Sequence, residues 1–100
     1  MKSKRQQKRL RESVKHYVPK APLSDILEIE AIASAGHLRH LPLSIAIWQA
    51  ITSHARHART DYDILLQEGY DRESARHFVL EELNTVLEDW GCTRRVEMNE

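Results

Sequence analysis

The sequence predicts an all-α protein, a small four-helix domain preceded by a basic, partly disordered N-terminal arm. Apolar residues recur every three or four positions in four segments, and no segment alternates polar and apolar residues as a strand would. With 100 residues, of which 41% are hydrophobic, the chain can bury a single core. Shifts in composition divide it into an arm (residues 1–20), a helical domain (residues 21–91) and a polar C-terminal tail (residues 92–100).

The first helix of the domain is expected at about residues 24–35. The side chains of Ser24 and Asp25 can accept hydrogen bonds from the free amides of its first turn. Asp25, followed three positions later by Glu28, also has the spacing of a capping box. Gly36 can adopt the left-handed conformation that often ends a helix, so we expect the helix to stop just before it.

The second helix, at about residues 43–57, is the most apolar segment of the chain. Its apolar residues cover nearly the whole circumference, which is typical of a central helix with neighbours on two sides. Ile45 and Trp48 lie away from the main apolar stripe. An alternative interpretation is therefore that these two residues form the contact of a homodimer.

A short third helix is expected at about residues 61–68 and a longer fourth helix at about residues 72–90. Thr60 and Asp71 precede them and are typical capping residues. A glycine that can end each helix follows directly, Gly69 in one case and Gly91 in the other.

Residues 1–20 and the rest of the chain carry opposite charges. The first twenty positions hold eight Lys or Arg and one acid, a net charge of +7, while the remaining eighty have a net charge of −7. Such dense like charge repels itself and stays mobile or meets an anionic surface. We therefore expect residues 1–8 to be disordered and residues 9–17 to form a helix only on docking.

The basic arm is the candidate contact for a polyanion, and nucleic acid is the partner that its charge favours. Lys and Arg neutralise phosphates and release counterions whatever the base sequence. The candidate polyanion-binding residues are Lys2, Lys4, Arg5, Lys8, Arg9, Arg11 and Lys15. Two other roles stay open for the arm: it keeps the protein in solution, or it folds against its own acidic domain.

The amino-acid composition of the chain argues against several classes of protein. Its single cysteine, Cys92, allows no intramolecular disulfide and no thiolate zinc cluster, which favours a cytoplasmic location. The apolar runs are only a few residues long, so we expect no membrane-spanning helix, no cleavable signal and no membrane contact. We also expect no cofactor.

Most of the polar side chains that could bind or react lie between His54 and Arg76. The spacing R-H-x-x-T-x-Y-D-x-L-L-x-x-G-x-x-R-x-x-A-R, which runs from Arg56 to Arg76, resembles the signature of an uncharacterised bacterial family, one of the domains of unknown function. The pair Trp90-Gly91 fits it too, so the resemblance covers about residues 40–91. The resemblance implies a small helical domain with no assigned activity, and no catalytic role follows from it.

Six of these side chains are expected to form one polar cluster where the second, third and fourth helices meet. They are His54, His57, Tyr62, Asp63, Arg72 and Arg76. The first interpretation is structural, with an arginine–aspartate fork that ties helix ends together. The second is an anion site, in which the arginines and histidines receive a phosphate.

Two further interpretations of the cluster are weaker. His54, His57 and Asp61 have a workable spacing for a metal ion, although Thr60 is expected to break the helix between them. A hydrolytic pair of His57 with Asp63 lacks an activated nucleophile.

The sequence as a whole favours a non-enzymatic binding module. Its acidic helical domain serves as a folded anchor and its basic arm contacts nucleic acid or another polyanion. The alternative is a protein-interaction or dimerisation domain that uses Ile45 and Trp48. A small enzyme, or a metal or phosphate site, built on His54, His57 and Arg76 is less favoured.

Overall fold

Helix is the only regular secondary structure in residues 3–98, the part of the chain that the computed structural model describes. Five helices follow one another along the chain: α1 (Lys4–Tyr17), α2 (Leu23–Ala33), α3 (Leu43–Arg59), α4 (Tyr62–Gln67) and α5 (Arg72–Asp89). The predicted all-α class is confirmed, and the helix that was expected to form only on docking is already present as α1. None of the helices in this described range is long and apolar enough to cross a membrane.

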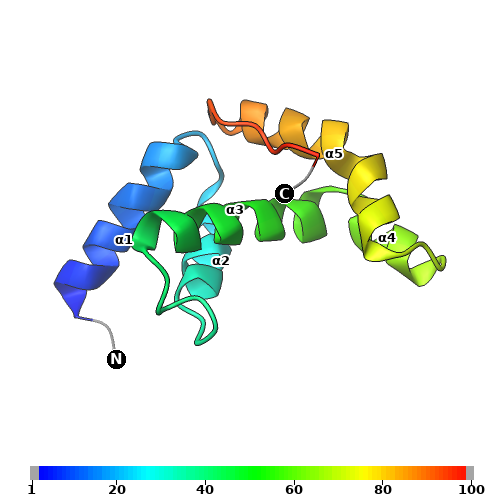
Figure 1. The fold of residues 1–100 in the computed structure, drawn as a ribbon. Helices are drawn as coiled ribbons and strands as arrows, with labels where there is room; N and C mark the ends of the chain where they lie inside the picture. The colour runs from blue at the N-terminus through cyan, green and yellow to red at the C-terminus, as the bar shows by residue number, and fades with distance from the viewer. Residues whose placement is uncertain (1–2, 99–100) are drawn as a thin grey trace.

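The central helix is α3, as its apolar surface predicts. Figure 1 shows α3 crossing the middle of the molecule, with α1 and α2 packed at one end and α5 running back over it from α4 at the other. Ile47 and Ile51 are at most 1% exposed. Because neighbours cover several sides of α3, Trp48 is also buried, at 6% exposed, whereas Ile45 keeps 46% of its surface exposed.

The expectation of a partly disordered arm is wrong for its described part. A continuous helix, α1, starts at Lys4 and is capped by Ser3, whose hydroxyl accepts a hydrogen bond from the Gln6 amide. Leu10 and Val14 belong to the main core. Burial of these apolar side chains outweighs the repulsion between the cations of the helix. The basic segment is therefore a packed helix.

Both ends of α2 differ from the expected ones. No side chain caps its first turn, because Asp25 is buried and its carboxylate instead binds His54 and Arg59 of α3. A buried carboxylate needs such partners more than the free amides of a helix end do, because water can bind those amides. Gly36 does not adopt the left-handed conformation, and α2 ends before it is reached.

The ends of α4 and α5 are close to the predicted ones. Asp71 caps α5 by accepting a hydrogen bond from a first-turn amide at 2.7 Å. Gly69 and Gly91 follow the two helices with φ angles of 101° and 81°, which only glycine adopts without strain. The Thr60 hydroxyl accepts a hydrogen bond from the Tyr62 amide at 3.2 Å. The residue directly before α4 is Asp61, however, and its side chain does not cap the helix.

The segment after α5 was expected to be a polar tail, but its described part packs on the helices. Val96 is 4% exposed and is bound by Asn84 of α5. In Figure 1 this red segment turns back along α5 toward the middle of the molecule. It therefore forms part of the surface that faces α3.

Candidate functional site

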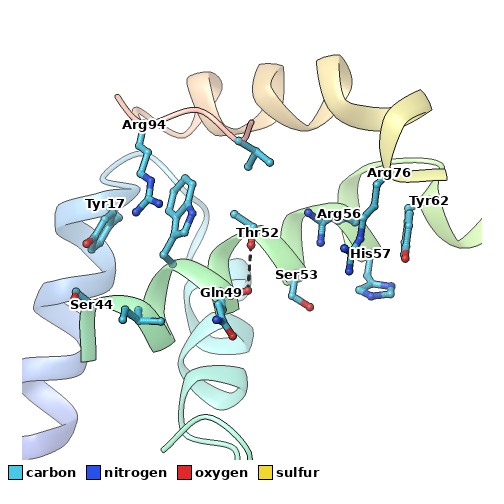
Figure 2. Close-up of a pocket in the computed structure, with 13 residues that line it drawn as sticks. Tyr17, Ser44, Gln49, Thr52, Ser53, Arg56, His57, Tyr62, Arg76 and Arg94 are labelled. Atoms are coloured by element: carbon cyan, nitrogen blue, oxygen red, sulfur yellow. Dashed lines mark hydrogen bonds between the residues drawn. The ribbon is translucent and has the colours of Figure 1, made fainter. Parts of the chain in front are cut away.

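A pocket of about 680 Å³ lies along one face of α3. The face extends from Ser44 to His57, and the surrounding walls come from α1, α4, α5 and the C-terminal segment (Figure 2). Three arginines line the pocket, namely Arg56, Arg76 and Arg94. Within residues 3–98, no Asp or Glu lines it. The pocket is therefore suited to an anion.

One end of the pocket is cationic. Figure 2 shows Arg56, His57 and Arg76 gathered near Tyr62, where α3, α4 and α5 meet. The Arg56 guanidinium lies 5.8 Å from the centroid of the Tyr62 ring, a cation–π distance. Nδ1 of His57 is 2.6 Å from Oδ1 of Asp63, just outside the pocket lining. Arg56 and Arg76 thus supply the positive charge of this end.

The other end of the pocket is aromatic and carries the third arginine. The Arg94 guanidinium lies over the Trp48 ring, 4.1 Å from its centroid. The Tyr17 ring of α1 packs against Trp48 with centroids 6.2 Å apart and planes inclined by 37°. Arg94 itself is exposed, so its outer face is open to a ligand.

The structure brings together only part of the predicted polar cluster. Four of its six members lie in or beside the pocket: His57, Tyr62, Asp63 and Arg76. His54 does not line the pocket and instead binds Asp25 of α2. Arg72 is exposed at the start of α5 and does not line the pocket either.

Asp25 joins α2 to α3 through two partners. Its Oδ1 lies 2.7 Å from Nε2 of His54, and its Oδ2 accepts from Nη2 of Arg59 at 2.6 Å. Burial raises the pKa of the Asp25 carboxyl, but the hydrogen bonds from Arg59 and His54 outweigh burial and hold that pKa below its ordinary value. His54 also stacks on Trp90, with ring centroids 6.2 Å apart. These contacts hold the His54 ring between α2 and the end of α5.

The two histidines considered for a metal ion have different carboxylate partners. His54 binds Asp25, whereas His57 binds Asp63. Over the described residues, no group of three or more His, Cys, Asp or Glu side chains is placed to hold a metal ion.

The outer surface of α1 carries most of the predicted polyanion-binding residues. The exposed ones are Lys4, Arg5, Lys8, Arg9 and Lys15. In the described part of the chain, one ion pair involves this set, between Lys8 and Glu12 at 4.0 Å, and both of its side chains are exposed. Lys2, the remaining member at the start of the chain, lies outside the described residues.

Arg11 differs from the other predicted contacts because it faces α2. Its Nη2 donates to Oε1 of Glu30 at 3.0 Å, and its Nε donates to Oε2 of the same carboxylate. This two-pronged pair fixes α1 against α2. Arg11 therefore serves the packing of α1 more than its outer surface.

A smaller hollow of about 290 Å³ lies between α1 and α3, between the outer surface of α1 and the main pocket. Arg9 and His16 of α1 line it, and so do Tyr17 and Ser44. Because Tyr17 and Ser44 also line the main pocket, the two hollows adjoin, and Arg9 is the cation of the α1 surface that reaches this junction among the described residues.

Sequence reasoning missed Arg56 and Arg94 as site residues, and it considered Trp48 only as a core residue or, alternatively, as part of a dimer contact. Arg56 could have been found, because it follows Trp48 by two steps of four residues, through Thr52, and so belongs to the same row of side chains along α3. Arg94 could not have been found from the sequence, because its position depends on the C-terminal segment folding back along α5.

The fold and the pocket define a small all-α protein with a cationic surface helix and an arginine-lined pocket. The chain belongs to the DUF2293 family of uncharacterized conserved proteins, whose family model matches residues 7–91. The matched range includes most of α1, so it extends further toward the N-terminus than the resemblance seen in the sequence. No match was found among curated proteins or among solved structures.

Proposed function

We propose that this protein is a binding module for nucleic acid and that the outer surface of α1 contacts the phosphate backbone. One observation carries the proposal: α1 is fixed by the core and presents five exposed cations, Lys4, Arg5, Lys8, Arg9 and Lys15. A fixed row of cations gives up less conformational entropy on binding than a mobile arm.

The cations of α1 are available for phosphates. The pair between Lys8 and Glu12 is exposed at both ends, and such pairs contribute little stability, so a phosphate can replace the carboxylate. Residues 21–100 have a net charge of −7 and repel a polyanion. This asymmetry directs the nucleic acid to α1.

The test compares two triple variants with the same change in net charge. The first removes three cations of α1: Lys4→Gln, Lys8→Gln and Lys15→Gln. The control removes three exposed arginines elsewhere: Arg39→Gln, Arg72→Gln and Arg95→Gln. Fluorescence anisotropy with a labelled single-stranded oligothymidylate over a range of salt concentrations gives the affinity and its dependence on salt.

The α1 variant is expected to lose affinity and much of the salt dependence. Each phosphate contact contributes about 0.7 to the slope of log affinity against log salt for a single strand, so losing three contacts lowers the slope by about 2. The control is expected to keep the wild-type slope. An absence of binding by the wild type at low salt, or an equal loss in both variants, contradicts the proposal.

A further inference from the structure

The two ends of the main pocket offer different chemistry to a ligand. At one end, an exposed guanidinium lies over an indole ring, a surface on which a flat ring can stack. At the other end, Arg56 and Arg76 provide two positive charges. Trp48 and Arg56 are eight residues apart on α3, which corresponds to about 12 Å along the helix axis.

A ligand that uses both ends has an aromatic ring and an anionic group separated by about that distance. We infer that the pocket binds a single-stranded segment of nucleic acid, with a base stacked on the outer face of the Arg94 guanidinium, which itself lies over Trp48, and a backbone phosphate at Arg56 and Arg76. This inference rests on the proposed function and names the form of nucleic acid that the protein selects.

A single strand fits this arrangement better than a duplex. The bases of a duplex are paired and stacked on one another, so they cannot turn onto a protein side chain, whereas an unpaired base can. Stacking of bases on aromatic or guanidinium faces, combined with cations along the backbone, is the usual way in which proteins bind single strands. The pocket contains both elements.

The path from α1 to the pocket supports the same occupant. A strand bound to the outer surface of α1 passes Arg9 and His16 in the smaller hollow and reaches Tyr17, which lines both hollows. The two hollows adjoin, so a strand on α1 can reach the pocket by way of Arg9.

A second copy of the chain is a weaker occupant. Ile45 is the one large apolar side chain among the pocket's described lining residues that is strongly exposed. A stable interface buries roughly 800 Å² on each partner, which a single isoleucine cannot provide. The arginines would also face each other across a symmetric contact.

Three labelled probes of equal length separate the contributions of bases and phosphates. They are an oligothymidylate of a dozen nucleotides, the same strand with abasic sites in place of the bases, and a duplex. The wild type is expected to bind oligothymidylate about tenfold more tightly than the abasic strand, the effect of one stacked base. The abasic strand is expected to keep the phosphate contacts of α1, Arg56 and Arg76 and to lose only the stacked base, whereas the duplex is expected to bind through α1 alone.

Matched arginine variants locate the two ends of the pocket. Arg94→Gln is expected to lower the affinity for oligothymidylate about tenfold, whereas Arg95→Gln, at the next exposed position and outside the pocket, leaves it nearly unchanged. Arg76→Gln is expected to weaken binding of oligothymidylate by a similar factor. Its control is Arg72→Gln, one turn earlier on α5 and outside the pocket.

Tryptophan fluorescence reports stacking on Arg94, because the Arg94 guanidinium lies over the Trp48 ring. The chain has two tryptophans, so Trp90→Phe leaves Trp48 as the single emitter. Oligothymidylate is expected to quench this emission and the abasic strand is not, with circular dichroism confirming that the variant is folded.

Equal affinity for the three probes, with full dependence on the lysines of α1, overturns the single-strand inference and leaves the proposed function intact. A stable dimer that is lost in Ile45→Ser, together with no quenching of Trp48, overturns it as well. Failure of all probes to bind the wild type at low salt overturns both proposals.

Discussion

Asn84 binds Val96 through both of the backbone polar groups of that residue. The side-chain Nδ2 donates to the Val96 carbonyl at 3.1 Å, and Oδ1 accepts from the Val96 amide at 2.8 Å. Asn84 is buried, so the pair is shielded from water. It fixes the C-terminal segment along α5, and this position brings Arg94 over Trp48.

Asn84→Ala is expected to lower the free energy of unfolding by about 1–3 kcal/mol, since both hydrogen bonds of a buried side chain are lost. It also releases the segment that carries Arg94, so affinity for oligothymidylate should fall as in Arg94→Gln. Urea unfolding and fluorescence anisotropy measure the two effects. The control is Thr85→Ala, at an exposed position whose hydroxyl bonds only within α5. Full affinity in Asn84→Ala would show that this pair does not position Arg94.

Much of the fold could be predicted from local sequence, because most helices have broad apolar faces and clear ends. The helices α2 to α5 lie within a few residues of their predicted positions. A helix at residues 9–17 was expected only on docking; that α1 starts at Lys4 and packs on the domain could not be predicted, since its stability comes from distant contacts. Leu10 and Val14 pack in the shared core, and Arg11 binds Glu30 of α2.

Part of the candidate site was predictable: His57, Tyr62 and Asp63 are neighbours in sequence, and Arg76 lies near the start of the helix that follows after a short turn. His57 and Asp63 are six positions apart, and the contact between them follows from the turn that joins α3 to α4. The partner of His54 is Asp25, 29 positions earlier, and no local pattern indicates that pair. Long-range packing decides which of the polar side chains share a surface.

Gly91→Ala is expected to destabilise the protein by about 1–2 kcal/mol, because a side chain at φ 81° is strained. A Cβ at this position would also lie 3.0 Å from Cγ of Pro19, in the connection that follows α1. Gly36→Ala is the control, since no atom lies within 4 Å of its added Cβ and its φ is not positive. Thermal unfolding followed by circular dichroism compares the two variants. An equal effect of both substitutions would contradict the close approach at Gly91.

The stability of the protein is expected to fall in acid, partly through Asp25. Its folded-state pKa lies below the ordinary value, so its contribution is fully present above the unfolded-state pKa of about 3.9 and is lost as the pH falls through the folded-state pKa. Asp71, whose pKa is lowered by the hydrogen bond from the Ser74 amide, acts in the same direction. Urea unfolding at a series of pH values from neutral to acid measures this dependence.

Asp25→Asn is expected to remove part of that pH dependence and to lower the free energy of unfolding by about 2–3 kcal/mol at neutral pH. This loss is somewhat smaller than the loss expected for a fully buried ion pair, because Arg59 is half exposed. Asp89→Asn, at the exposed end of α5, is the control and should follow the wild-type pH profile. Parallel pH profiles for Asp25→Asn and the wild type would show that another group causes the acid sensitivity.

Leu10→Ala tests whether the packing of α1 matters for binding as well as for stability. Removal of this 5% exposed side chain is expected to lower the free energy of unfolding by about 2–3 kcal/mol and to speed tryptic cleavage within α1. Affinity for all three nucleic-acid probes should fall together, since a loosened helix must be ordered again on binding. Leu27→Ala, at a position 47% exposed on α2, should change stability by no more than about 0.5 kcal/mol and leave binding unchanged. If Leu10→Ala loses stability but keeps full affinity, the cations bind as a flexible arm and their binding does not require the fixed position of α1.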